Sequence, residues 1–219
     1  MKIARRQLVI AAPGVVLPAS AAPVDLALAL AVDVSASVDF GEFGLMIGGY
    51  AEAFRDPELA ARLTSGVHGA AAVAMLFWSG PGARDLAVPW TRVASVEQAG
   101  ALAEAIEYAP RIVPAGATAL GEGLTAATAL LARCPYAASR RVIDVSGDGS
   151  NNAGLPVATG RAAALALGAT VNGLAVVDEE PDLEEYYRDE VIGGHGAFER
   201  LAPPATADDR VLVEALFGR

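Results

Sequence analysis

Three hard oxygen donors stand close together near the start of the chain: the carboxylate of Asp33 and the hydroxyls of Ser35 and Ser37. They follow a continuously apolar segment, residues 24–30, which is typical of a strand buried on both faces. In open α/β sheets, ligands bind in the loops at the carboxyl ends of the strands. One carboxylate and two hydroxyls suit a small, hard cation such as Mg²⁺.

Helix capping is the alternative interpretation of these residues. Aromatic and aliphatic residues recur at helical spacing from Phe40 onward, so a helix is predicted to begin there. Serine and aspartate before a helix satisfy its free backbone amides, and Asp39 with Glu42 fits a capping box. A short motif of this kind matches by accident often enough that it does not decide the question alone.

Two later tracts contain further oxygen-bearing residues of the kind that a metal site needs. Thr118 stands at the start of an alanine- and leucine-rich segment that is typical of a helix, and Asp148 follows a second apolar strand-like segment, residues 140–146. An aspartate, two serines, a threonine and an aspartate before glycine, in this order and context, resemble the metal-ion-dependent adhesion site of the von Willebrand factor A domain. More narrowly, the segments DVSASVD, FWSGPG, VPWT, RRVIDVSGDGSNNAG, TVNGLAV and YYRDEVIGG are similar to a bacterial family of secreted proteins of this type, a domain of unknown function.

The resemblance implies a metal site and a function. It implies Mg²⁺ (or Mn²⁺) bound by Ser35 and Ser37, with Thr118 as a further ligand and with Asp33 and Asp148 acting directly or through waters. Ala36 stands where relatives often have glycine, a position that carries no ligand. The implied function is a protein-binding, adhesion-type module whose ion takes a carboxylate from a protein partner, and not an enzyme. The alternatives are a Mg²⁺-dependent hydrolase that uses a metal-bound water and a scaffold with a vestigial site.

The order of predicted elements indicates a doubly wound α/β fold, Rossmann-like, with a mostly parallel six-stranded sheet. Strands are expected at residues 24–33, 70–78, 85–90, 140–146, 170–177 and 198–201, and helices at 40–55, 95–108, 118–133, 156–168 and 207–217. The short link between the second and third strands predicts an antiparallel edge strand. We expect the sheet order 3-2-1-4-5-6 and one von Willebrand A-like domain over residues 23–219.

Residues 1–22 have the features of a secretory signal peptide: early basic residues, an apolar run and small residues at its end. Arg5 and Arg6 also fit a partial twin-arginine signal. Export to the periplasm or the medium is therefore predicted. The chain has a net charge of -10 and its single lysine is Lys2, which disfavours nucleic acid and anionic membranes as partners and excludes lysine chemistry in a mature chain. The apolar runs beyond the leader are too short to span a bilayer.

Other chemistries fit the sequence less well. Residues 147–152 nearly match a dinucleotide-binding loop, but they place a carboxylate between the glycines where it would repel pyrophosphate. Neither Ser79 nor Ser146 lies in the G-x-S-x-G pattern of serine hydrolases. His68 and His195 stand in glycine-rich contexts typical of exposed loops, and Cys134 is interpreted as a structural thiol.

Two further features concern carboxylates. The acidic stretch 178–190 follows the predicted fifth strand, at the edge of the sheet where Asp33 and Asp148 lie. We interpret it as a solvated loop and helix face that borders the site. Asp144 stands inside a strand that is predicted to be buried, where an unpaired carboxylate is costly. We expect Asn172 on the next strand to be its hydrogen-bond partner.

Overall fold

Apolar strands covered on both faces form the centre of the molecule. The computed structural model describes residues 21–176 and 180–202. The strands are β1 (Ala21–Asp33), β2 (Ala71–Trp78), β3 (Arg84–Val93), β4 (Tyr136–Gly147), β5 (Thr170–Val176) and β6 (Glu199–Ala202). The helices are α1 (Phe40–Arg55), α2 (Pro57–Leu63), α3 (Val96–Glu107), α4 (Leu120–Ala132), α5 (Val157–Ala166) and α6 (Leu183–Tyr186), and α6 continues into a π-helical turn, η1 (Tyr187–Val191).

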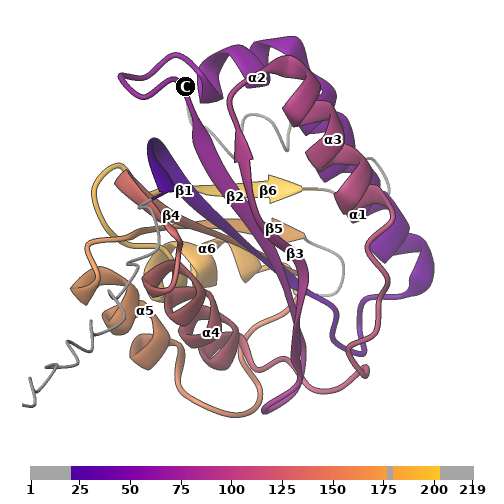
Figure 1. The fold of residues 1–219 in the computed structure, drawn as a ribbon. Helices are drawn as coiled ribbons and strands as arrows, with labels where there is room; N and C mark the ends of the chain where they lie inside the picture. The colour runs from indigo at the N-terminus through magenta and orange to yellow at the C-terminus, as the bar shows by residue number, and fades with distance from the viewer. Residues whose placement is uncertain (1–20, 177–179, 203–219) are drawn as a thin grey trace, which may run out of the picture.

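The sheet has the order β3-β2-β1-β4-β5-β6 (Figure 1). The pairs β1–β2, β1–β4, β4–β5 and β5–β6 are parallel, and β3 runs antiparallel to β2 at one edge. The predicted fold class, strand order and antiparallel edge strand are therefore confirmed. Because the chain leaves β1 toward β2 and returns to β4 on the other side of β1, the carboxyl ends of β1 and β4 meet at the point where the winding reverses, the usual ligand position in this class of fold.

Two apolar layers hold the sheet between its helices. Helices α1, α2 and α3 cover one face, and α4, α5 and α6 cover the other (Figure 1). Alternation along β1 divides the layers, because Leu28 and Leu30 pack with the first group and Ala27 and Ala29 with the second. Among the residues that the structure describes, no helix has the length and apolar character to cross a membrane.

Side-chain hydrogen bonds cap the first turns of α1 and α3, and the cap of α1 is the predicted capping box. In the capping box of α1, the amide of Glu42 donates to Asp39 Oδ1 at 2.8 Å and the amide of Asp39 donates to Glu42 Oε2 at 2.7 Å. Ser95 accepts from the amide of Gln98 at 3.3 Å at the start of α3. Asp39 is the cap of this helix, so capping of α1 does not account for Asp33, Ser35 and Ser37.

The structure contains one short helix that was not predicted, α2, and defines the bounds of the helix in the acidic stretch. Asp56 and Pro57 directly follow the predicted helix 40–55 and begin α2: Asp56 caps it by accepting from the amide of Glu58 at 2.7 Å, and Pro57 takes the first helical position. The acidic stretch is helical over α6 and η1, where Leu183, Tyr187 and Val191 are buried beneath the charged residues. The predicted helix at 207–217 lies outside the described residues, as does the predicted leader apart from Ala21 and Ala22, which belong to β1.

Candidate metal centre

Asp33 is the last residue of β1 and is fully buried. Its Oδ1 accepts a hydrogen bond from the amide of Ser35 at 2.7 Å, which folds the loop back on the end of the strand. Its Oδ2 is buried and has no hydrogen-bond partner among the described residues. Burial raises the pKa of Asp33 to about 7, opposed by its hydrogen bonds from Ser35 and reinforced by the charge of Asp148. A carboxylate in this position is incompletely satisfied by the protein.

The two serines connect Asp33 to the loop after β4. The Oγ atoms of Ser35 and Ser37 lie 3.1 Å apart, and Ser37 Oγ donates to Asp148 Oδ1 at 2.9 Å across 111 residues of sequence. Ser35 is buried, whereas Ser37 is exposed. This contact forms because β4 lies beside β1 and Asp148 directly follows the end of β4.

Thr118 comes to the same place from the loop between α3 and α4. Its amide donates to Asn152 Oδ1 at 2.9 Å, and the amide of Asn152 donates back to the carbonyl of Thr118 at 3.0 Å. A methyl group built on Gly149 would lie 3.8 Å from Thr118 Oγ1, so the threonine hydroxyl faces the loop that carries Asp148. The structure thus brings together the three tracts that hold the five predicted site residues.

Backbone hydrogen bonds fasten these loops to one another. The amide of Val34 donates to the carbonyl of Trp78 at the end of β2, and the amide of Ala36 donates to the carbonyl of Gly116, both at 2.8 Å. The hydroxyl of Ser79 donates to the carbonyl of Pro114 at 2.7 Å. The serine loop is therefore held by β2 and by the loop before α4, which limits the positions that its hydroxyls can take.

The floor of the site is closely packed at Gly147. A methyl group there would lie 2.7 Å from the hydroxyl of Tyr187 and 3.0 Å from Asp33 Oδ2. Tyr187 belongs to η1 and is fully buried, and its hydroxyl has no hydrogen-bond partner among the described residues. Burial, together with the negative charges of Asp33 and Asp148, raises the pKa of Tyr187 well above its ordinary value. The phenol is therefore a neutral group beneath the carboxylates.

Arg111 is a site residue that the sequence analysis missed. Its guanidinium donates to the carbonyls of Val34 and Ser35, each at 3.1 Å, and to the carbonyl of Asp39 at 3.3 Å. It also lies over the rings of Phe40 and Phe43, 5.3 and 5.5 Å from their centroids. A single arginine in a loop 72 or more residues away carries no local signal for these contacts.

Glu180 is the part of the acidic stretch that reaches the site. The amide of Ser150 donates to its two carboxylate oxygens at 3.2 and 3.0 Å, and the hydroxyl of Ser150 donates to Oε1 at 3.3 Å. A methyl group on Gly149 would lie 3.4 Å from Glu180 Oε1. The acidic stretch therefore borders the site as predicted, although residues 177–179, with Asp178 and Glu179, lie outside the described residues.

The other candidate residues lie elsewhere. His68 and His195 are exposed in loops that precede β2 and β6, at the amino ends of these strands and so at the edge of the sheet opposite to the site. Cys134 is half-buried after α4, and burial raises the pKa of its thiol. Asp144 receives a 2.7 Å hydrogen bond from Asn172 Nδ2, which confirms the predicted pair.

The donor set fits a hard cation. The described residues contain no group of three or more histidine, cysteine, aspartate or glutamate side chains placed to hold a metal. A cation at the site would therefore rely on the hydroxyls of Ser35, Ser37 and Thr118 as well as on Asp33 and Asp148. Oxygen donors of this kind suit Mg²⁺ or Mn²⁺ and do not suit softer metals. The unpartnered Asp33 Oδ2 gives such an ion a charged oxygen that the protein leaves unused.

Solved structures share the fold at low sequence identity. A von Willebrand factor type A structure from Catenulispora acidiphila is 17% identical over 89% of this chain and 43% of that chain, with a TM-score of 0.57. The pilus adhesin SpaC from Lactobacillus rhamnosus GG gives 15% identity, 86% and 29% coverage, and a TM-score of 0.61. Proximal thread matrix protein 1 from the mussel byssus, described with a zinc-occupied MIDAS motif, gives 16%, 70% and 38%, and a TM-score of 0.52. The chain thus spans less than half the length of each of these proteins.

Sequence comparison places the chain in a family. No curated protein matches the sequence. The family described as "Protein of unknown function (DUF1194)" matches residues 23–206, nearly the whole of the chain beyond the predicted leader. With its von Willebrand A fold, its three site loops and this match, the chain belongs to the DUF1194 family.

Proposed function

We propose that the chain is a periplasmic or secreted protein-binding module that holds Mg²⁺ or Mn²⁺ and uses it to capture a carboxylate of a partner protein. One observation carries the proposal. Asp33 presents an unpartnered, buried carboxylate oxygen within a group of hydroxyl and carboxylate oxygens that three separate loops bring together.

The roles of the side chains follow from their charge. Ser35, Ser37 and Thr118 supply neutral oxygens, while Asp33 and Asp148 supply charge, directly or through waters. Mg²⁺ favours six oxygens in an octahedral arrangement and readily keeps waters among them. Because neutral hydroxyls leave the ion electrophilic, the bound ion would attract a carboxylate from outside. Arg111 holds the carbonyls of the serine loop, so it fixes the loop in which two of these hydroxyls lie.

An exposed aromatic ring adjoins the site and supports docking of a protein. Phe40, in the first turn of α1, is 83% exposed, and its ring stacks on the Arg111 guanidinium. Aromatic side chains, phenylalanine among them, and arginine are enriched in the buried centres of protein interfaces. We infer that Phe40 contacts the partner beside its carboxylate.

The similar structures and the predicted leader both support a protein-binding role in the periplasm or the medium. The descriptions of the similar structures name a pilus adhesin and a matrix protein with a metal-occupied MIDAS motif, and the predicted leader would place the chain where such proteins work. A hydrolase that uses a metal-bound water needs a general base near the ion. Since both histidines lie at the opposite edge of the sheet, neither supplies one to this site.

The proposal is tested by capture on the immobilised chain from the secreted and periplasmic proteins of the source cells. We expect at least one protein to be retained in Mg²⁺, released by EDTA, and absent with the Asp33→Asn variant. Asp144→Asn is the matched control, because it changes an equally buried carboxylate that belongs to the interior pair with Asn172. Retention that EDTA and Asp33→Asn leave unchanged would refute metal-dependent capture.

A further inference from the structure

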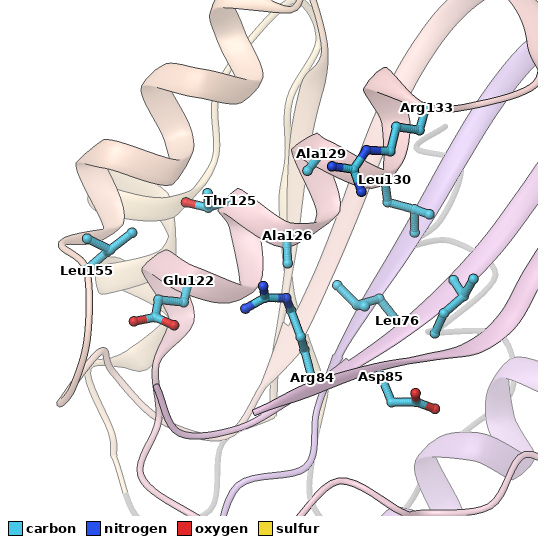
Figure 2. A pocket seen from close by; sticks show the side chains of 11 residues that line it. Leu76, Arg84, Asp85, Glu122, Thr125, Ala126, Ala129, Leu130, Arg133 and Leu155 are labelled. Atoms are coloured by element: carbon cyan, nitrogen blue, oxygen red, sulfur yellow. The ribbon is translucent and has the colours of Figure 1, made fainter. Parts of the chain in front are cut away.

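A groove lies between the edge strand β3 and helix α4 (Figure 2). Its volume is about 690 Å³. Apolar side chains form much of its lining: Leu76, Leu86, Ala126, Ala129, Leu130 and Leu155. Leu86 and Leu155 are 44% and 41% exposed. Because β3 ends the strand order, no further strand covers this side of the groove within the described part of the chain.

Two arginines frame the groove. Arg84 is the first residue of β3 and Arg133 directly follows α4. Figure 2 shows both guanidinium groups over the groove, with Arg84 close to Ala126. Both side chains are exposed, and neither forms a side-chain hydrogen bond or an ion pair with any residue that the structure describes. Their donors are therefore available to a ligand.

Within the described residues, the two acidic residues of the lining form no ion pair with these arginines. Glu122 uses its Oε2 to accept from the amide of Gly82 at 2.7 Å, so it is engaged in fastening the β2–β3 turn to α4. Asp85 follows Arg84 in a strand and so projects to the other face, and Figure 2 shows its carboxylate turned away from the groove. The chain has a net charge of -10, so two guanidinium groups without ion-pair partners over apolar side chains differ in charge from the molecule as a whole.

We propose that this groove binds an acidic segment of a partner protein, with two carboxylates on Arg84 and Arg133 and an apolar side chain between them on the floor. Arginine recognises carboxylates through its planar fork of donors. Helix α4 rises about 1.5 Å per residue, so Ala126 and Arg133 are separated by roughly 10 Å along it. A peptide in the polyproline II conformation rises about 3.1 Å per residue with three residues per turn, so its residues i and i+3 lie on one face about 9 Å apart, which gives the pattern acid-x-x-acid with apolar residues at x.

The groove does not depend on the metal site, since none of its residues is a proposed ligand. The test is an NMR titration of the ¹⁵N-labelled chain in EDTA with an acetylated, amidated hexapeptide that carries glutamates at positions 2 and 5 and leucines between them. We expect saturable shifts at the amides of Leu86, Ala126 and Leu130. The double variant Arg84→Gln, Arg133→Gln should bind about 3- to 10-fold more weakly, the effect of two exposed ion pairs.

The controls separate this site from general charge attraction. Arg62→Gln removes an exposed arginine in the last turn of α2, on the opposite side of the sheet, and should leave the affinity unchanged. A peptide with glutamines in place of the glutamates should bind as weakly as the wild-type peptide binds to the double variant. Failure to saturate, shifts outside the groove, or equal binding by the double variant or by the glutamine peptide would overturn the proposal.

Discussion

Asp33 and Asp144 are both buried carboxylates of the central sheet, and burial raises the pKa of each to about 7. Their surroundings separate their roles. Asp144 lies within β4 and receives a hydrogen bond from Asn172, which is itself buried on β5. Asp33 lies at the end of β1, among oxygen donors from other loops. Asp144 therefore belongs to the interior packing, and Asp33 is the residue that we propose for the cation.

The raised pKa of Asp144 makes a prediction about stability. Between about pH 4 and pH 7 the unfolded chain has lost this proton while the folded chain keeps it, so the contribution of Asp144 to stability falls as the pH rises through this window. Asp144→Asn removes this dependence. Urea denaturation from pH 4 to pH 8 should show the wild type losing up to about 4 kcal/mol relative to the variant. Parallel stability curves would show that Asp144 is ionised in the folded protein throughout.

At the scale of elements, α4 and α5 approach each other through glycines. A methyl group on Gly160 would lie 2.6 Å from the carbonyl oxygen of Gly121 and from Leu124 Cβ, so it would meet the backbone of α4. Gly160→Ala should destabilise the fold by about 1–3 kcal/mol through overpacking. Gly100 in α3 has nothing within 4 Å of the same position, and Gly100→Ala should gain about 0.5–1 kcal/mol from helix propensity. Equal effects of the two substitutions in urea denaturation would contradict this helix contact.

Glu180 lies in a loop beside the candidate site. Two roles are open to its carboxylate: it binds the ion directly, or it acts on the ion through its charge alone. Its carboxylate is occupied by the amide and hydroxyl of Ser150, so we expect it to act through charge. Glu180→Gln should weaken Mg²⁺ binding by less than about 3-fold, with the difference shrinking in high salt. Calorimetric titration at two salt concentrations measures this. A loss of more than about 10-fold that does not depend on salt would make Glu180 a ligand.

Local patterns predicted most elements and the order of the sheet, because apolar periodicity and caps act over a few residues. The bounds of α1 followed from the helical spacing after Phe40 and from the capping pair Asp39–Glu42. Helix α2 was missed because Asp-Pro both ends one helix and begins another. The helical part of the acidic stretch was predicted without bounds, because its charged surface hides the buried positions Leu183 and Tyr187.

Across the whole molecule, the sequence predicted only those site residues whose types occur in a recurrent order after the ends of strands. Asp33 and Asp148 could be placed together because parallel strands bring their carboxyl ends to one edge. The hydrogen bond from Arg111 to the serine loop forms between segments that are distant in the sequence. The same is true of the hydrogen bond from the amide of Ser150 to Glu180. Neither long-range contact has a signature in local composition.

The central claim is that Asp33 and the hydroxyls around it bind a divalent cation, and calorimetric titration with Mg²⁺ and Mn²⁺ tests it most directly. We expect one ion per chain for the wild type and for the Asp144→Asn control. Asp33→Asn keeps the oxygen that accepts from Ser35 but removes the charge, so it should fold with no detectable binding. A wild-type chain that binds neither ion at millimolar concentration, or a folded Asp33→Asn chain that binds as the wild type does, would contradict the claim.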